Sequence, residues 1–206
     1  MLTLVEEVLL LTLHDKDGSF VSVPAFSLEY ALSGAILMDL ALRDRIDTDP
    51  EKLMIVDPTP TGDDLLDPVL EKISASPKTL STQEWLNALA LDTHPIKERA
   101  LDRLVDHGIL QRQEKKFLWV FGQRRYPVID NREQREVKLR ILGILLSDEI
   151  PEARDTVLIA LADSCALFES ILSREEYLSV SERIQQIARM DLIGQAMIQM
   201  IHEMRR

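Results

Sequence analysis

Hydrophobic residues occupy every face of the stretch from Ser27 to Ile46 when it is wound at 3.6 residues per turn. A helix that is apolar on all sides is buried on all sides, so this stretch is expected to form the central helix of the fold. Ser27 and Glu29 suit its first turn as a capping hydroxyl and a favourably placed acid, and Arg43 and Arg45 suit its last turn. Its internal charges argue against a membrane-spanning helix.

Amphipathic periodicity predicts further helices on both sides of the central one. In the first of them we place the leucines and valines inward and Glu6 and Glu7 outward, as a solvated edge. Weak alternation over Lys52–Val56 predicts a small strand. The remaining helices are expected at about residues 3–13, 64–74, 81–91, 95–106, 131–146, 151–168, 174–190 and 191–204.

The pattern changes period after Gly108, which is placed to end a helix. The runs Ile109–Gln113 and Phe117–Phe121 flank a short polar stretch, and this predicts a β-hairpin at about residues 109–126. We therefore predict a mainly α fold. A single compact domain over residues 1–206 surrounds a buried central helix and carries a protruding hairpin.

The overall charge of this 206-residue chain is −11, which argues against a surface coated for nucleic acid. Residues 94–126 differ, because eight Lys or Arg there face only four carboxylates. We expect this segment to form a local basic surface on an acidic protein. Cys165 is the one cysteine of the sequence, and its apolar neighbours predict a buried thiol in a reducing compartment.

Sequence signatures of catalysis or metal binding are missing. The four histidines are scattered without zinc-ligand spacing, the glycines are isolated, and no nucleophile-elbow motif occurs. The aspartates of the loop 57–67 do not follow the spacing of a calcium loop, so we assign them to turns and helix capping. Asp63 and Asp64 are interpreted as a solvated helix edge. We expect no enzyme activity, no metal and no cofactor.

Three interpretations of the predicted hairpin remain open at this point. A helix followed by a hairpin with basic flanks is typical of a winged-helix DNA-binding protein. Aromatic residues ringed by cations are also what an interfacial membrane protein needs. In the third interpretation alternate hairpin residues pack on the core and the others form a subunit contact, as in a structural interaction protein.

Five stretches in one order resemble the Golgi phosphoprotein 3 family. They are residues 2–11, 36–46, 60–67, 98–110 and 157–162. The resemblance implies one mostly helical domain with a protruding hairpin. It also implies a peripheral membrane protein without catalytic activity, because eukaryotic members recognise phosphatidylinositol 4-phosphate and bind the cytosolic tails of glycosyltransferases.

The resemblance carries over only part of the family's headgroup site. Pro24 and Ser33 stand where eukaryotic members have a tryptophan and an arginine, whereas His94 and Lys97 stand at two further arginine positions. Binding to an anionic phospholipid or phosphoinositide is therefore expected with weak headgroup selectivity. The headgroup residues are predicted to be Lys97, His94, Arg103, Arg124 and Arg125, on a basic face that includes Arg112.

The family's apolar hairpin tip matches Phe117, Leu118 and Trp119, and these are the predicted membrane-inserting residues. We expect a cytoplasmic protein that is peripheral on the inner membrane face. Its partners would be anionic lipid, tails of membrane proteins and further copies through the hairpin, rather than nucleic acid. The extended N-terminal region of eukaryotic members is not present in this sequence, and this predicts a prokaryotic homologue.

Overall fold

The structure is a computed structural model of the whole chain. It describes residues 2–14, 17–49, 51–114, 124–129, 132–190, 192–196 and 199. Its helices and strands are, in chain order, α1 (Leu4–Leu11), α2 (Ser27–Leu42), β1 (Ile46–Thr48), β2 (Leu53–Ile55), α3 (Asp67–Ser74), α4 (Thr82–Ala90), α5 (Thr93–Asp106), β3 (Gln113–Glu114), β4 (Arg124–Arg125), α6 (Arg132–Leu145), α7 (Ala153–Ser164), α8 (Phe168–Ile171) and α9 (Arg174–Ala188).

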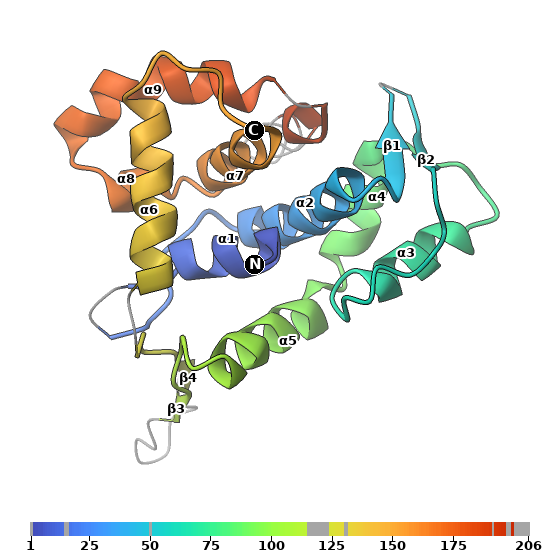
Figure 1. Cartoon of the computed structure of the whole chain (residues 1–206), viewed down its shortest axis with the longest axis horizontal. Coiled ribbons are helices and arrows are strands. Elements are labelled where there is room, and N and C mark those ends of the chain that lie inside the picture. Colours follow the sequence, from blue (N-terminus) through green and yellow to red (C-terminus); the bar gives the residue numbers. More distant parts are fainter. Residues whose placement is uncertain are drawn as a thin grey trace.

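The predicted mainly helical fold with an antiparallel hairpin is confirmed. Helices α1 and α2 lie in the middle of the molecule, with α3, α4 and α5 along one flank and α6, α8 and α9 along the other (Figure 1). Helix α2 contacts α1, α4, α5 and α7. Its residues from Ala31 to Leu40 are all buried, as expected for a helix that is apolar on every face.

The boundaries of the central helix differ from the prediction at both ends. Ser27 does not cap it, because its hydroxyl donates to the Pro24 carbonyl at 2.8 Å and Phe26 precedes the helix with a left-handed φ of 62°. The helix ends at Leu42, since Asp44 also adopts a left-handed φ and starts a turn. Residues 43–45 of the predicted last turn form a tight turn instead, and Ile46 begins strand β1.

Strand β1 pairs antiparallel with β2, with Ile46 opposite Ile55 and Thr48 opposite Leu53. The strand predicted over Lys52–Val56 is thereby confirmed, although its partner strand was not predicted and its first residue, Ile46, was assigned to the central helix. Ile46 is buried, although the charged residues Arg43, Asp44 and Arg45 separate it from the hydrophobic run of α2. Periodicity alone does not separate a buried strand from a buried helix end, and the partner strand decides it here.

Local helix signals in the middle of the chain were predicted correctly. Ser81 caps α4 and forms a capping box with Glu84, whose carboxylate accepts the Ser81 backbone N–H at 2.8 Å. Gly108 follows α5 with a φ of 73°, the left-handed conformation that glycine adopts without strain. The helix predicted over 151–168 ends earlier, at Ser164, because Ala166 adopts a left-handed φ of 54°, and the short α8 begins only at Phe168.

Strands β3 and β4 form the base of the predicted hairpin, with Gln113 opposite Arg125. A bridge between Leu110 and Val128 extends this pairing toward the body of the protein. The base lies at a corner of the molecule, beyond the C-terminal end of α5 (Figure 1). The predicted second strand, 117–121, falls outside the described residues.

Candidate functional site

Lys97 is a half-buried cation on the second turn of α5. Its Nζ lies 4.0 Å from the centroid of the Phe20 ring, the geometry of a cation–π contact. Burial lowers the pKa of Lys97, while the carboxylates of Glu29 and Glu98 act in the opposite direction. The charge of Lys97 therefore faces an acid on α2. His94 lies one turn earlier on the same helix and is exposed.

Ser33 lies on α2, and Pro24 lies on the chain that leads into it. Ser33 is fully buried, and its hydroxyl donates to the Glu29 carbonyl at 2.8 Å. Pro24 is partly buried, and its carbonyl accepts the Ser27 hydroxyl. Neither position offers a free hydrogen-bond donor to a phosphate, and Glu29 adds a negative charge beside Lys97. The weak headgroup selectivity expected from the sequence stays a prediction.

Arg103 occupies the centre of an ion-pair network instead of an open surface. Its Nε lies 3.1 Å from Glu6 Oε1, and its Nη1 donates to Asp63 at 2.7 Å and to Asp64 at 2.9 Å. The guanidinium joins three separate elements: α1, the loop before α3, and α5. Arg103 therefore connects α5 to α1 and to the loop before α3, and its donors are engaged within the protein.

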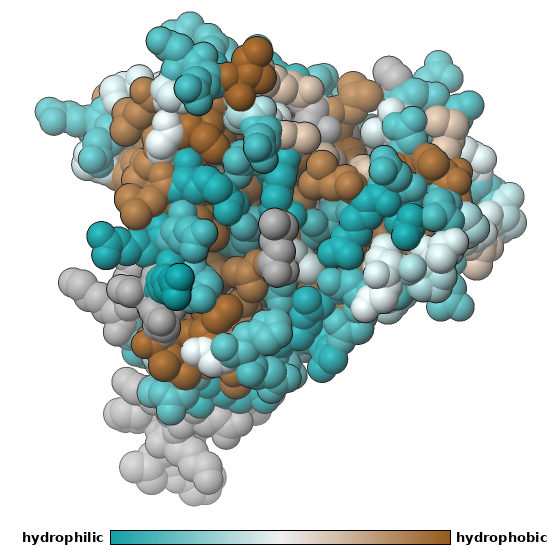
Figure 2. Space-filling model, viewed as in Figure 1, coloured by the Kyte–Doolittle hydropathy of each residue, from teal (hydrophilic) through white to brown (hydrophobic). Residues whose placement is uncertain are grey.

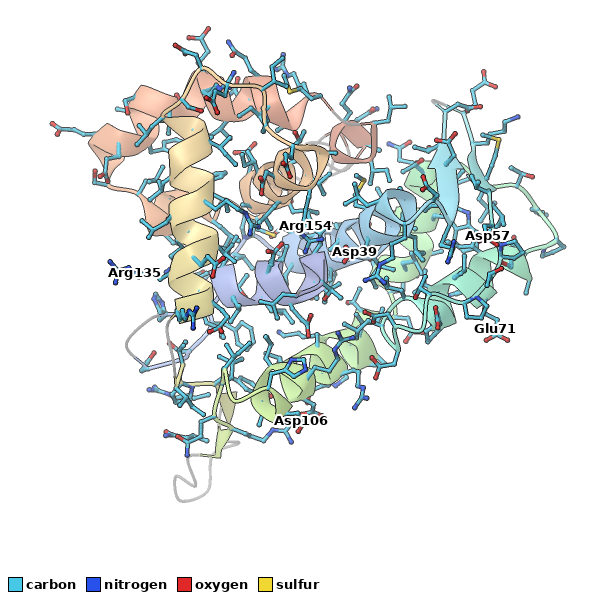
Figure 3. All side chains as sticks on the ribbon, viewed as in Figure 1. Asp39, Asp57, Glu71, Asp106, Arg135 and Arg154 are labelled. Carbon is cyan, nitrogen blue, oxygen red and sulfur yellow. The ribbon has the colours of Figure 1, made fainter. Side chains whose placement is uncertain are left out.

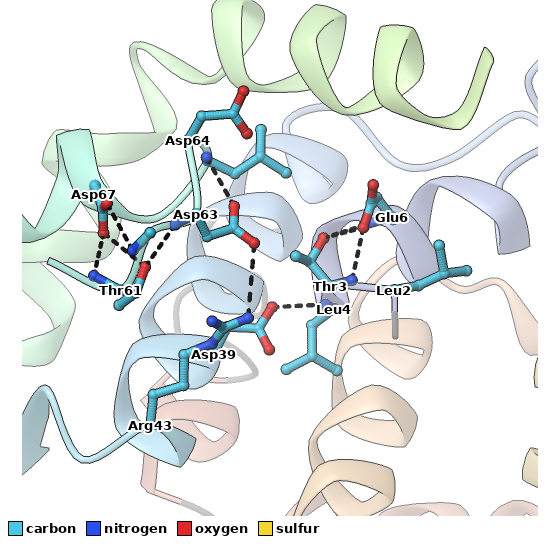
Figure 4. Close-up of polar contacts among 12 residues, drawn as sticks. Leu2, Thr3, Leu4, Glu6, Asp39, Arg43, Thr61, Asp63, Asp64 and Asp67 are labelled. Atoms are coloured by element: carbon cyan, nitrogen blue, oxygen red, sulfur yellow. Dashed lines mark hydrogen bonds and ion pairs between the residues drawn. The ribbon is translucent and has the colours of Figure 1, made fainter. Parts of the chain in front are cut away.

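The loop 57–67 holds its aspartates by turn hydrogen bonds and ion pairs (Figure 4). Asp67 accepts from the Thr61 N–H at 2.7 Å, the Thr61 hydroxyl at 2.6 Å and the Gly62 N–H at 3.0 Å. Although partial burial alone would raise it, these three donors lower the pKa of Asp67. Asp63 also pairs with Arg43 at 3.7 Å. Asp63 and Asp64 are therefore ion-paired, not merely solvated as predicted.

A second network surrounds the start of α1. Arg154 of α7 donates to Asp39 at 3.1 Å, to Glu7 at 2.9 Å and to the Leu2 carbonyl at 2.6 Å. Figure 3 shows Arg154 and Asp39 side by side between α7 and α2. Arg140 of α6 adds 2.8 Å contacts to Glu7 and to Asp155. Desolvation raises the pKa of Asp39, against the Leu4 N–H and Arg154, which lower it.

The prediction that Glu6 and Glu7 face solvent is wrong. Their exposed fractions are 0% and 3%, and the whole of α1 is buried. Glu6 completes a capping box with Thr3, and both acids reach arginines of other helices. The sequence did carry a signal for this burial, because apolar residues surround the pair on every face of α1, as they do in α2.

Two of the predicted cations pair with carboxylates at the hairpin base. Arg125 lies 2.5 Å from Asp17, and Arg112 forms an ion pair with Asp102 of α5. Tyr126 beside them is only 1% exposed, and its N–H donates to the Gly18 carbonyl at 2.8 Å. These contacts attach the base of the hairpin firmly to the body.

The structure thus separates the predicted site residues into three groups. Lys97 and His94 lie together on α5, Arg103 lies inside a network, and Arg125 lies at the hairpin base. The backbone of Arg124 belongs to β4, and its side chain is not described. The predicted inserting residues Phe117, Leu118 and Trp119 lie outside the described residues.

Metal-binding groups and the thiol of Cys165 are the other chemistry-bearing features of the described part of the chain. No three His, Cys, Asp or Glu residues there are grouped to hold a metal ion. Cys165 is fully buried as predicted, and its thiol donates to the Ser27 carbonyl at 3.4 Å. Burial raises the pKa of this thiol to about 12, so it is unreactive at neutral pH.

A family profile described as Golgi phosphoprotein 3 (GPP34) matches residues 4–204. The chain belongs to the Golgi phosphoprotein 3 family. This Golgi phosphoprotein 3 chain is 33% identical over 211 residues to vacuolar protein sorting-associated protein 74 of Eremothecium gossypii, with 85% of the chain and 63% of that relative covered. It is also 33% identical over 167 residues to the protein of the same name from Schizosaccharomyces pombe, with 71% of the chain and 49% of that relative covered.

These matches cover less than two thirds of either relative's own length. Both relatives are eukaryotic, so they do not support the expectation of a prokaryotic homologue. Within the described residues of this Golgi phosphoprotein 3 chain, no helix combines the length and the apolar character needed to cross a bilayer.

Proposed function

We propose that this protein is a peripheral membrane adaptor that attaches reversibly to anionic lipid through its hairpin corner. Membership of the Golgi phosphoprotein 3 family is the observation that carries the proposal. By resemblance to that family, its protein partners would be the cytosolic tails of membrane proteins. We propose no catalytic activity for it. The hairpin corner of the protein binds the cytosolic face of the membrane.

The hairpin base supports this role mechanically. Bonds from Tyr126 to Gly18 and from Arg125 to Asp17 fix the second strand to the body, and the Arg112–Asp102 ion pair fixes the first. The Gln111 N–H donates to the Pro127 carbonyl and joins the two arms of the hairpin. The nine residues that join these strands include five consecutive hydrophobic ones, from Phe117 to Phe121. Because the base is fixed to the body, insertion of this segment into a membrane would attach the whole protein.

Electrostatics support only a modest attraction. Residues 111–126 contain five Lys or Arg and one Glu. Arg112 and Arg125 pair with acids outside this segment, which lowers its net contribution from +4 to +2. Each unpaired cation near an anionic leaflet is worth about 1 kcal/mol. Insertion of two apolar side chains, at roughly 1.5–3 kcal/mol each, therefore supplies the larger share.

Headgroup selectivity is proposed to be weak. Lys97 faces Glu29, and Ser33 donates its hydroxyl within the protein, so a phosphomonoester would meet one fixed cation and one acid. A selective phosphate site needs several charge-assisted hydrogen bonds. At matched surface charge the protein should therefore prefer vesicles with phosphatidylinositol 4-phosphate only weakly over vesicles with another anionic lipid.

The test is sedimentation with neutral, generic anionic and phosphoinositide-bearing liposomes, with a short DNA duplex as a parallel ligand. Replacing Phe117 and Leu118 by serine should lower binding to anionic liposomes at least tenfold without changing the thermal midpoint. The matched control replaces Val56 and Leu178, which are exposed hydrophobic residues elsewhere, by serine and should bind as wild type.

Three outcomes contradict the proposal in different ways. Binding of duplex DNA at physiological salt without binding to anionic liposomes would establish the winged-helix alternative. An unfolded Phe117→Ser/Leu118→Ser protein would show that the pair packs in the core. A folded variant with undiminished lipid binding but a changed oligomer size would make the hairpin a subunit contact.

A further inference from the structure

Phe20 lies between α5 and the hairpin base and contacts a residue of each. The Nζ of Lys97 on α5 lies 4.0 Å from the centroid of the Phe20 ring. The ring of Tyr126, which follows β4, meets the Phe20 ring edge to face, with the centroids 6.1 Å apart and the planes at 71°. The ammonium is therefore no farther from the Tyr126 centroid than the sum of these two distances. Lys97 thus lies beside the hairpin base, although it belongs to another element.

The segment that carries Phe20 also fixes the hairpin base. Phe20 pairs with Leu13 in an antiparallel bridge, two residues after Gly18. The Gly18 carbonyl accepts the Tyr126 N–H at 2.8 Å. Gly18 also packs so closely against the backbone of Tyr126 and Pro127 that a Cβ would find no room. Backbone contacts therefore set the position of the Phe20 ring relative to the hairpin.

The ring holds Lys97 in a different way from that in which carboxylates hold the neighbouring arginines. In the described part of the basic segment 94–126, four arginine side chains each pair with a carboxylate: Arg99, Arg103, Arg112 and Arg125. With the other described residues, Lys97 forms neither an ion pair nor a hydrogen bond. A carboxylate cancels the charge of a cation and occupies its N–H donors. An aromatic ring attracts the ammonium through its quadrupole and leaves both available.

Glu29 of α2 is the acid that competes for this ammonium. The carboxylates of Glu29 and Glu98 both attract Lys97 electrostatically, Glu29 more strongly, but neither forms an ion pair with it. A lysine side chain has a flexible four-carbon stem, so without the Phe20 ring the ammonium could swing toward Glu29. In that position its charge would be neutralised within the protein.

The corner of the molecule at the hairpin base also exposes apolar surface. Ile129, in the arm that follows β4, is 62% exposed. Figure 2 shows hydrophobic surface at this lower corner, next to the residues drawn in grey. An available cation beside apolar surface is what an interfacial protein uses on an anionic leaflet.

We propose that Phe20 is a positioning residue, which keeps the Lys97 ammonium beside the hairpin base and available to the phosphate of an anionic lipid. This inference rests on the proposed attachment to anionic lipid and extends it to a cation outside the hairpin. Lys97 then attracts the leaflet next to the point where the hairpin inserts. Phe20 itself does not contact the phosphate and acts only through Lys97.

Liposome sedimentation with single and double substitutions tests this role. One cation near an anionic leaflet contributes roughly fivefold to affinity, so Lys97→Met should lower binding to liposomes of phosphatidylcholine and phosphatidylglycerol by about that factor. Phe20→Leu, which removes the ring but keeps an apolar side chain, should lower binding equally. The double variant should bind within about twofold of either single one, because both changes remove the same contribution. A double variant weakened by the product of the two effects, roughly 25-fold, would overturn the inference.

Rescue variants separate positioning from a merely structural role. Phe20→Tyr keeps the ring and should bind within about twofold of wild type. Glu29→Gln added to Phe20→Leu removes the competing acid and should restore binding to the level of Glu29→Gln alone. The matched control is Lys72→Met, at an exposed lysine of α3 away from the hairpin base (Figure 1), which should change binding less than about twofold. Failure of both rescues would show that Phe20 does not act through Lys97.

NMR without lipid distinguishes this inference from the proposed function. A methylene group above an aromatic ring is shifted upfield by the ring current, so the Lys97 Hε resonances should show this shift in wild type and in Phe20→Tyr but not in Phe20→Leu. A wild-type protein that binds anionic liposomes without this shift would overturn the role of Phe20 and leave the proposed function standing. A wild-type protein that shows the shift but binds no anionic liposome would refute the proposed function, and with it the use of Lys97 for lipid.

Discussion

Replacing Arg103 by methionine should destabilise the protein substantially while leaving lipid binding by the folded molecule intact. The guanidinium pairs with Glu6, Asp63 and Asp64 at 3.1, 2.7 and 2.9 Å. Glu6 is 0% exposed, so the substitution leaves a carboxylate in the core without its cation. Methionine preserves most of the apolar stem, and the effect therefore reports on the lost charge.

The expected loss of stability follows from these contacts. Breaking a buried ion pair by removing one partner costs about 3–5 kcal/mol. Glu6 still accepts hydrogen bonds from the Thr3 N–H at 2.7 Å and hydroxyl at 2.9 Å, which places the cost near the lower end, at about 3 kcal/mol. For a chain of this size that corresponds to a fall in Tm of roughly 6–12 °C.

Arg99 supplies a matched control one turn earlier on α5. It also pairs with Asp64, but its side chain is 54% exposed. Exposed ion pairs contribute about 0–1 kcal/mol, so Arg99→Met should shift Tm by only a few degrees. Restoring neutrality inside the core, with Glu6→Gln added to Arg103→Met, should recover part of the lost stability.

Thermal unfolding and urea titration measure the effect, and liposome sedimentation at 20 °C separates it from lipid binding. The reasoning fails if Arg103→Met keeps a Tm within 2 °C of wild type. If that variant keeps its stability but loses lipid binding, Arg103 contacts the lipid headgroup, as predicted from the sequence. Its role would then be in binding, not in stabilising the ion-pair network.

Two further predictions concern the backbone and pH. In Gly18→Ala, the Cβ would lie 2.0 Å from the Tyr126 carbonyl carbon at a φ of +61°, so the hairpin base must shift. The Tm should therefore fall by several degrees more than in Gly108→Ala, where the space is open. Equal falls in Tm for the two variants would contradict the close packing at Gly18. The pKa of Asp67 is lower in the folded state than its ordinary value of 3.8, so the ionised carboxylate stabilises the folded protein at pH values above 3.8. This stabilisation is lost as the pH falls through the folded-state pKa. Asp67→Asn should therefore cost about 1 kcal/mol at pH 7 and progressively less below pH 4, and a pH-independent difference in urea titrations would refute this assignment.

Short-range features of the fold were readable from the sequence. The burial of α2, the capping box at Ser81 and Glu84, and the left-handed turn at Gly108 depend on neighbours within a few residues. Hydrophobic periodicity and capping chemistry act over the same distance, so both appear in the sequence itself. The hairpin between 109 and 126 was predicted for this reason too, although its described strands pair at Gln113 and Arg125.

Part of the candidate site was equally visible. Lys97 lies on the helix predicted from residue 95, whereas His94 was placed just before it; α5 begins at Thr93, so both residues lie on it, three positions apart. The acid that faces Lys97, Glu29, belongs to another helix 68 positions earlier, and nothing in the local pattern of either helix indicates their proximity.

Only the tertiary structure decided which charges are available at the surface. Glu6 and Glu7 looked like a solvated edge, yet they meet Arg103, Arg140 and Arg154, which lie on three other helices. The same holds for the basic segment, because Arg125 finds Asp17 more than a hundred residues away. A charge count along the chain records how many cations a segment has. Whether each one is free depends on long-range packing, since an arginine placed beside a buried carboxylate is held there by the cost of leaving either charge alone.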